Sequence, residues 1–323
     1  MRYLSYHEKL STYEELALNS ENTPHVSYVE ENDTVYFMPV ILPKIDVGSI
    51  AYVDSSSNLK YCSPDDWSSS LGTPVGVVAI PANFLPDSPE MRLIAIYGVD
   101  SAGTRNETGE TEETGSEWFS SATYDNPELD NYYDYGPCLD VDSNTITGHN
   151  GFYLCSDNFT RQPNPYDTGY GWNTTTGTNI TPSPYKEDGS FNEQFIDNTF
   201  FPVDGRWLNP FTDFKGKENT DILVGLGTAY TAANAARKYK AYDGDTLEWY
   251  LPSAGELAVY FHDFNKINAA IAKARGVKLS ESFFWSSSEY SPNYATGLNP
   301  NRGILGNVMK YDYSYVRPFA LIS

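Results

Sequence analysis

A capped amphipathic helix is the feature that most constrains the fold of this chain. Ser253 and Glu256, three residues apart, form a capping box, in which the two side chains satisfy backbone N–H groups at a helix start. Apolar residues then recur at spacings of three and four: Leu257, Tyr260, Phe261, Phe264, Ile267, Ile271 and Ala274. Gly276 stands where a left-handed residue ends a helix. The pattern predicts one helix from Ser253 to Arg275.

Four short strands are predicted after this helix, at 282–287, 294–298, 303–310 and 315–322, with turn-forming Pro, Asn, Asp and Gly between them. A second helix is predicted to begin at a cap formed by Thr220 and Asp221. One face of that helix is apolar and partly small: Ile222, Leu226, Ala229, Tyr230, Ala233 and Ala236. We therefore expect two helices and an antiparallel meander, with close packing along the small residues.

The preceding sequence is predicted to be mostly β. Residues 25–29 and 34–38 flank an acidic turn and predict a hairpin. Further strands are predicted at 49–53, 59–62, 74–80 and 91–97. Gly76 lies inside one of them, which indicates a bulge or a close approach of another backbone.

The fold class predicted from these elements is α+β, in four parts. An N-terminal anchor arm and hairpin (1–39) and a small β module (40–101) are all β. A loop-rich aromatic region (102–219) belongs to the distal domain, and the core (220–323) carries the two helices and the meander. Long irregular segments such as the third part commonly carry function or cover another element.

The charge is concentrated in the first two thirds of the chain. Residues 1–219 contain 34 Asp and Glu against 11 Lys and Arg, a net charge of -23, whereas residues 220–323 contain 9 against 10, or +1, which gives the total of -22. An acidic surface repels nucleic acid and anionic membrane, so neither is an expected partner. The acidity serves either as a solvated surface or as a complement to a basic anchoring partner.

Cysteine content and hydropathy indicate the compartment. Cys62, Cys138 and Cys155 form no C-x-x-C pair, and free thiols in a reducing cytoplasm are favoured over a bridge between Cys138 and Cys155. The first residues lead into polar sequence, without the apolar run of a secretory signal. No run approaches the roughly 20 apolar residues of a membrane helix. We expect a protein that is not inserted in a membrane.

No motif indicates a metal, a cofactor or catalysis. Residues 140–144 begin like a calcium loop, but Thr145 replaces the glycine and Gly151 the glutamate of an EF-hand, so an Asp-rich turn is favoured. The four histidines lack metal-ligand spacing: His7, His25, His149 and His262. Phosphate-binding and nucleophile motifs are absent. We expect no cofactor and disfavour an enzyme.

The candidate binding residues form a dense tyrosine and asparagine set in the last meander. They are Asn293, Tyr294, Asn299, Asn301, Arg302, Asn307, Lys310, Tyr311, Asp312, Tyr313 and Ser314. Recognition surfaces favour Tyr for rigid amphipathic contact and Asn or Ser for adaptable hydrogen bonds, and such faces also suit sugars. The alternative interpretation is a meander with polar turns and no ligand.

Several of these motifs resemble a known fold. Residues 249–257 (Trp-Tyr-Leu-Pro-Ser-Ala-Gly-Glu-Leu), 284–290 (Phe-Trp-Ser-Ser-Ser-Glu-Tyr) and 316–319 (Val-Arg-Pro-Phe), together with the glycine-containing strand 303–310, look like the C-terminal half of the C-type-lectin-like fold. The resemblance is to its formylglycine-generating-enzyme-like branch, which includes variable proteins of diversity-generating retroelements. Residues 23–31 and 71–78 are similar to N-terminal parts of fibre proteins of Bacteroidales and crAss-like bacteriophages.

The resemblance implies a non-enzymatic virion fibre, most simply a trimeric capsid (head) fibre. Its N-terminal segment would attach to the major capsid protein or another virion protein, and its lectin-like domain would bind a host-surface glycan or protein through 293–314. The alternatives are a tail-fibre receptor-binding protein, a bacterial surface adhesin and a formylglycine-generating-type enzyme. The calcium and sugar motifs of true C-type lectins are absent, and no cysteine lies beyond Cys155, which disfavours both calcium-dependent sugar binding and cysteine-based oxidase chemistry.

Overall fold

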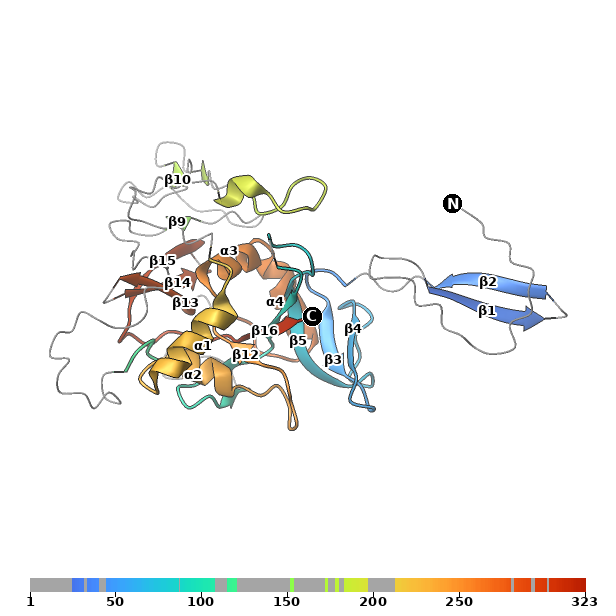
Figure 1. Ribbon diagram of the computed structural model, residues 1–323, viewed down its shortest axis with the longest axis horizontal. Helices are drawn as coiled ribbons and strands as arrows, with labels where there is room; N and C mark the ends of the chain where they lie inside the picture. The colour runs from blue at the N-terminus through green and yellow to red at the C-terminus, as the bar shows by residue number, and fades with distance from the viewer. Residues whose placement is uncertain are drawn as a thin grey trace. The chain divides into compact units, whose positions relative to one another are not determined.

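The structure is a computed structural model of the 323-residue chain. It describes residues 25–31, 34–40, 45–86, 88–107, 115–120, 152–153, 172–173, 178–179, 183–196, 213–279, 282–291, 294–300 and 302–323. The chain divides into two compact units, 1–44 and 45–323 (Figure 1). In the first unit, β1 (His25–Glu31) and β2 (Thr34–Val40) form the predicted antiparallel hairpin, which is therefore confirmed.

A six-stranded antiparallel sheet organises the second unit. Its strands, in spatial order, are β12 (Trp249–Tyr250), β16 (Phe319–Ile322), β6 (Met91–Ala95), β5 (Thr73–Ile80), β3 (Ile50–Val53) and β4 (Leu59–Cys62). The strands predicted between residues 49 and 97 are all present. Because β16 pairs with β6, the segments predicted as a separate β module and a C-terminal core share one sheet, and position 101 is not a boundary of the fold.

Gly76 lies where both predicted roles of a strand glycine are needed. The register between β3 and β5 shifts after Ala51, which pairs with Gly76, so that Tyr52 pairs with Pro74. A Cβ atom at Gly76 would lie 2.9 Å from the carbonyl oxygen of Ile94 on β6. The bulge and the close approach of a neighbouring backbone are both confirmed.

A second sheet contains the predicted meander. It consists of β13 (Phe284–Ser291), β14 (Tyr294–Asn299), β15 (Ile304–Met309) and β9 (Phe152–Tyr153), in that order. The last predicted strand, 315–322, is shorter than expected and lies in the six-stranded sheet as β16. Two further pairs are small: β7 (Gly98–Val99) with β8 (Arg105–Asn106), and β10 (Trp172–Asn173) with β11 (Thr178–Asn179). A 3-10 turn, η3, spans Glu193–Ile196.

The capping box at Ser253 is confirmed, but the prediction of one continuous helix is wrong. The N–H of Ser253 donates to Glu256 Oε2 at 2.9 Å, and the N–H of Glu256 donates to Ser253 Oγ at 3.5 Å. The helix is divided into α3 (Ala254–His262) and α4 (Phe264–Lys273), because the backbone of Asp263 leaves the helical region at φ -101° and ψ 20°.

The end of α4 differs in detail from the prediction. Arg275, at φ 62°, occupies the left-handed position that was expected for Gly276. The N–H of Gly276 donates to the carbonyl of Ile271 at 2.9 Å, and that of Arg275 to Ala272 at 3.1 Å, which completes a Schellman motif. A Cβ atom at Gly276 would lie 2.5 Å from the carbonyl oxygen of Ile96, so glycine is required there for close packing.

The second predicted helix is also divided. α1 spans Gly216–Leu226 and α2 spans Thr231–Lys238. Thr220 lies inside α1 and caps neither helix: its hydroxyl donates to the carbonyl of Gly216 at 2.7 Å and accepts the N–H of Leu251 at 2.9 Å. Ile222 and Leu226, which were predicted on the packed face, are exposed, whereas the predicted small residues Ala229, Ala233 and Ala236 are buried, together with Ala232 and Ala235. These alanines pack in one cluster with Trp249 and Trp285.

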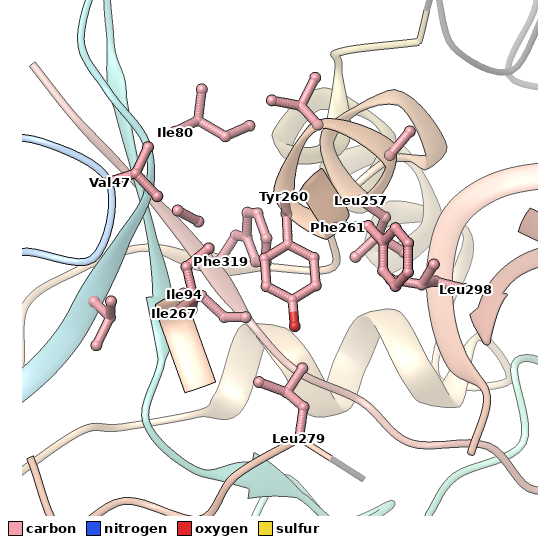
Figure 2. Packing of buried hydrophobic residues seen from close by; sticks show 14 of the residues in the cluster. Val47, Ile80, Ile94, Leu257, Tyr260, Phe261, Ile267, Leu279, Leu298 and Phe319 are labelled. Atoms are coloured by element: carbon pink, nitrogen blue, oxygen red, sulfur yellow. The ribbon is translucent and has the colours of Figure 1, made fainter. Parts of the chain in front are cut away.

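The main core lies between α3, α4 and the six-stranded sheet. Figure 2 shows Tyr260 of α3 beside Ile94 and Phe319 of the sheet and Ile267 of α4. Leu257 and Phe261 of α3 lie beside Leu298 of β14. All of these side chains are at most 2% exposed. The protein is therefore α+β with antiparallel sheets, and its largest core joins residues from both ends of the second unit.

A candidate binding surface on the C-terminal meander

The structure divides the predicted binding residues between the two ends of one hairpin. β14 and β15 pair from Tyr294 opposite Met309 to Asn299 opposite Ile304. The five steps between these six residues, at about 3.4 Å each, place the two ends roughly 17 Å apart. Arg302 belongs to one end and Tyr294 to the other. Asn293 and Asn301 lie outside the described residues, and only the backbone of Asn307 is described, opposite Thr296.

At the first end, the asparagine side chain shapes the turn. Asn299 Oδ1 accepts the N–H of Arg302 at 3.0 Å, and Asn299 is 7% exposed. Gly303 completes the turn with φ 61°. Asn299 is therefore mainly a turn former, whereas Arg302 is exposed. The prediction that both residues face a ligand is supported by exposure only for Arg302.

At the other end, residues 311–313 form what we call the tyrosine turn. Tyr311 is 57% exposed and Tyr313 is 58% exposed, and Asp312 between them is exposed as well. The hydroxyl of Tyr311 donates to Met309 Sδ at 2.7 Å, and the N–H of Asp312 donates to the carbonyl of Met309 at 2.9 Å. Tyr294, at the same end of the hairpin, is half-buried against the main core. The tyrosine turn is where the predicted residues are most accessible.

Lys310 was predicted to face a ligand, and the structure contradicts this. Lys310 is 2% exposed, and its ammonium forms an ion pair with Glu289, which is also buried. The ammonium lies 4.8 Å from the centre of the Trp118 ring. Burial of a lysine is tolerated when a carboxylate and an aromatic face replace its water. Lys310, which directly precedes the tyrosine turn, is therefore a buried structural residue.

The residues on either side of the tyrosine turn, Lys310 and Ser314, are hydrogen-bonded to the segment 115–120. The carbonyl of Lys310 accepts the N–H groups of Trp118 and Phe119 at 2.9 and 3.0 Å. Ser314 and Ser116 exchange two backbone hydrogen bonds, of 2.9 and 3.1 Å. Ser314, the last residue of the predicted set, is consequently buried. The two exposed tyrosines thus project from a turn whose neighbours on both sides are held in place.

Two tryptophans bind this segment to the meander. Trp285 Nε1 donates to the carbonyl of Ser116 at 2.7 Å, and Trp118 Nε1 donates to the carbonyl of Ser286 at 2.8 Å. Both rings are at most 1% exposed. Trp118 was not singled out in the sequence, since it follows a Gly-, Thr- and Glu-rich stretch that has no strand or helix period. Its sequence signal is limited to the aromatic pair Trp118-Phe119 within an otherwise polar stretch.

Among the described residues, the most buried carboxylate is that of Glu256, and its role is structural. Glu256 accepts hydrogen bonds from Arg92 Nε at 2.8 Å and from the hydroxyl of Tyr250 at 3.0 Å, in addition to its capping contacts. Burial raises the pKa of Glu256, and the adjacent Arg92 guanidinium opposes that rise. Arg92 was also not singled out, because an arginine inside an apolar strand gives no indication of its partner. The pair joins β6 to α3.

A second buried polar group connects α1, α3 and β13. The carboxylate of Asp213 accepts the Nδ2 hydrogen of Asn219 at 3.0 Å and a hydrogen bond from Ser288 Oγ, while its carbonyl accepts from Ser253 Oγ at 2.6 Å. Desolvation raises the pKa of the Asp213 carboxyl, and these hydrogen bonds oppose the rise. The contacts hold three elements together.

Where the structure describes the chain, no cluster of three or more His, Cys, Asp or Glu side chains could hold a metal ion. The Asp-rich turn 140–144 and two of the cysteines, Cys138 and Cys155, lie outside the described residues, and Cys62 is a half-buried free thiol. None of the described helices is long and apolar enough to cross a bilayer.

Comparison with known proteins gives one structural neighbour. The chain matches no protein-family model and no curated protein. It is similar to a fimbrial protein from Bacteroides ovatus ATCC 8483 with a TM-score of 0.44 and 10% sequence identity, over 93% of this chain and 57% of that one. The chain thus spans little more than half the length of this neighbour, and a likeness of this size does not establish a family.

Proposed function

We propose that this chain is a non-catalytic recognition protein that contacts its ligand through the tyrosine turn. The observation that carries the proposal is the exposure of Tyr311 and Tyr313, both above half, on a turn anchored to buried neighbours. Tyrosine combines an apolar ring with a polar hydroxyl and has few rotatable bonds, so it loses little entropy on contact. The carboxylate of Asp312 between the rings adds a hydrogen-bond acceptor that suits hydroxyl groups or amides.

The hydrogen-bond and ion-pair partners of three buried carboxylates support a non-catalytic function. Glu256 is held by Arg92, Glu289 by Lys310, and Asp245 accepts the Nε1 hydrogen of Trp249 at 2.7 Å. A general acid or base must reach a substrate proton, whereas these groups are turned toward structural partners inside the protein.

A more specific proposal is that the chain is a trimeric head fibre on the surface of a bacteriophage virion. In this proposal the segment 1–39 attaches to the major capsid protein or another virion protein, and a C-type-lectin-like C-terminal domain binds a host-surface glycan or protein. Support comes from the motif resemblance at 249–257, 284–290 and 316–319 and from the separation of an N-terminal unit, 1–44. Weak individual sites, of millimolar affinity or about 4 kcal/mol, would gain from multivalent display.

The binding surface is tested by replacing Tyr311 and Tyr313 together with alanine. Labelled protein is titrated onto a panel of Bacteroidales cells and counted by flow cytometry. We expect at least a tenfold loss of apparent affinity, equivalent to about 1.4 kcal/mol. Replacement of Ile222 and Leu226 with alanine is the matched control, since these side chains on α1 are 49% and 54% exposed. Equal binding by the tyrosine variant and the wild type would show that the tyrosine turn is not the contact surface.

The opposite end of the hairpin is examined with Arg302→Ala in the same titration. Arg302 is exposed and belongs to the end of the hairpin that lies roughly 17 Å from the tyrosine end. A loss of binding confined to this variant would indicate that the ligand binds at the Asn299 turn.

Localisation separates the fibre proposal from its alternatives. Immunogold labelling of purified particles is expected to mark capsids. Label on tails alone would favour a tail-fibre receptor-binding protein, and label on bacterial cells without particles would favour an adhesin. Thiol-dependent turnover that is lost in Cys155→Ser would favour the enzyme alternative.

A further inference from the structure

Met309 connects the end of a strand to the tyrosine turn. It is the last residue of β15, where it pairs with Tyr294 on β14. Its thioether sulfur accepts a hydrogen bond from the hydroxyl of Tyr311 at 2.7 Å, and its backbone carbonyl accepts the N–H of Asp312 at 2.9 Å. Met309 therefore contacts the turn through both its side chain and its backbone.

The contact with Met309 distinguishes the two ends of the Tyr311 side chain. The hydroxyl is hydrogen-bonded within the protein, although the side chain as a whole is 57% exposed. The ring is consequently the part of Tyr311 that a ligand can contact without first breaking a hydrogen bond. Because the sulfur holds the hydroxyl end of this side chain, the chemical state of Met309 affects where the ring lies.

We propose that Met309 is an oxidation site, and that its conversion to the sulfoxide displaces Tyr311 and weakens binding at the tyrosine turn. This inference deepens the proposed function and rests on it. The oxidant is a peroxide. With hydrogen peroxide, a sulfur lone pair attacks one oxygen, the O–O bond breaks, and the other oxygen leaves as water with both protons. The sulfur is oxidised and the peroxide is reduced, so no further reactant is needed.

The sulfur of Met309 is accessible to a small oxidant. Met309 is half-buried, and its contact with Tyr311 lies at the surface. Met91 on β6 is different, since it is 5% exposed and packs in a buried cluster with Val78 and Leu93. A peroxide must reach the sulfur that it oxidises, so Met91 provides a reference within the same chain. The side chains of Met1 and Met38 lie outside the described residues.

Oxidation changes both the size and the polarity of the group that Tyr311 contacts. A thioether is apolar and a weak hydrogen-bond acceptor, whereas a sulfoxide is polar and adds an accepting oxygen. The hydroxyl of Tyr311 lies 2.7 Å from the sulfur, which leaves no room for an atom between them. The hydrogen bond is therefore lost or transferred to the new oxygen, and in both cases the ring moves. The backbone hydrogen bonds of Lys310 and Ser314 confine this change to the turn.

Peptide mass mapping of the full chain during treatment with dilute hydrogen peroxide tests the oxidation site. We expect Met309 to gain one oxygen at least about tenfold faster than Met91. Tyr311→Phe removes the hydroxyl that occupies a lone pair of the sulfur, so it should raise the rate at Met309 and leave that at Met91 unchanged. Equal rates at the two methionines would overturn the proposal, and so would a Tyr311→Phe variant in which Met309 reacts no faster than in the wild type.

The effect on binding is measured by the flow-cytometric titration on Bacteroidales cells. Peroxide should lower the apparent affinity of the wild type at least about fivefold, and methionine sulfoxide reductases should restore it. Met309→Leu is the matched control, because it keeps every cysteine and the other methionines. Its affinity after peroxide should equal that of its own untreated sample. Near-ultraviolet circular dichroism should be unchanged by peroxide in both proteins, because the buried tryptophans report on the core.

The outcomes separate this inference from the proposed function. If the oxidised wild type binds normally while the double alanine variant of Tyr311 and Tyr313 does not, the turn binds the ligand and Met309 does not control it. An equal peroxide effect in Met309→Leu would assign that effect to another residue and overturn the proposal. Normal binding by the double alanine variant would overturn the proposed function together with the effect on binding, and the mass mapping would still decide whether Tyr311 shields the sulfur.

Discussion

Arg92 Nε donates to Glu256 Oε1 at 2.8 Å, although the two residues are 164 positions apart. The side chains are 3% and 1% exposed, so the pair is fully inside the protein. Glu256 also accepts the N–H of Ser253 at the start of α3. One carboxylate therefore caps a helix and ties that helix to the middle of the six-stranded sheet.

Loss of Arg92 should be costly because it leaves the Glu256 carboxylate buried without its cation. We expect Arg92→Met to lower the free energy of unfolding by about 3 to 5 kcal/mol in urea titrations. Lys273→Met is the matched control, since it breaks an ion pair with Asp65 whose side chains are 54% and 93% exposed. That change should cost less than about 1 kcal/mol. Similar losses in the two variants would contradict the assigned role of the buried pair.

Lys310 should behave as a structural residue. Lys310→Met removes the ammonium that neutralises Glu289, and we expect a loss of about 3 kcal/mol in the free energy of unfolding. A second change, Glu289→Leu, should restore part of this loss, because an apolar pair avoids the desolvation of two charges. Chemical denaturation of both single variants and the double variant measures the coupling. A double variant less stable than Lys310→Met would oppose this interpretation.

Two glycines should respond in opposite directions to alanine. Gly225 lies within α1, and a Cβ atom there would meet no atom within 4 Å. Gly225→Ala should stabilise the protein by about 0.5 to 1 kcal/mol through helix propensity. Gly276→Ala should destabilise it by about 1 to 3 kcal/mol, because the new Cβ would lie 2.5 Å from the Ile96 carbonyl oxygen. Thermal unfolding of the two variants is the measurement, and shifts of the same sign would contradict the packing described here.

The raised pKa of Asp213 should appear in the pH dependence of the free energy of unfolding. Burial raises its pKa above the ordinary value of 3.8, so the folded protein holds this proton more tightly than the unfolded chain. The contribution of the group is greatest below the ordinary value and falls as pH rises through the raised pKa. The free energy of unfolding of the wild type minus that of Asp213→Asn should therefore fall as pH rises from acid toward neutral. Denaturant titrations across this range measure it, and a value that rises with pH would contradict the raised pKa of Asp213.

The helix start and the strand positions could be predicted from the sequence because their causes are local. The capping box needs only Ser253 and Glu256, and the strands of 49–97 carry their own apolar pattern and turns. The division of the helix at Asp263 could not be predicted this way. Phe264 and Ile267 continue the apolar spacing across the break, so the period is the same on both sides.

The candidate site could be predicted only in part. Tyr311 and Tyr313 are exposed as the polar context indicated, but Lys310 beside them is buried. Its burial depends on Glu289, 21 residues away, and on Trp118, which comes from a different part of the chain. Composition identifies residues that suit recognition, whereas the direction of each side chain is decided by partners that are distant in sequence.

The order of strands in the six-stranded sheet has a consequence for biosynthesis. β6 ends at Ala95, and its neighbour β16 begins at Phe319, so 224 residues must be translated before these two strands can pair. At translation rates of about 5 to 20 residues per second, this interval lasts roughly 11 to 45 seconds. During that time the edge of β6 that later binds β16 is unpaired and apolar. Chaperone capture of nascent chains, and slow refolding in isolation, are the cellular and kinetic signatures that this topology implies.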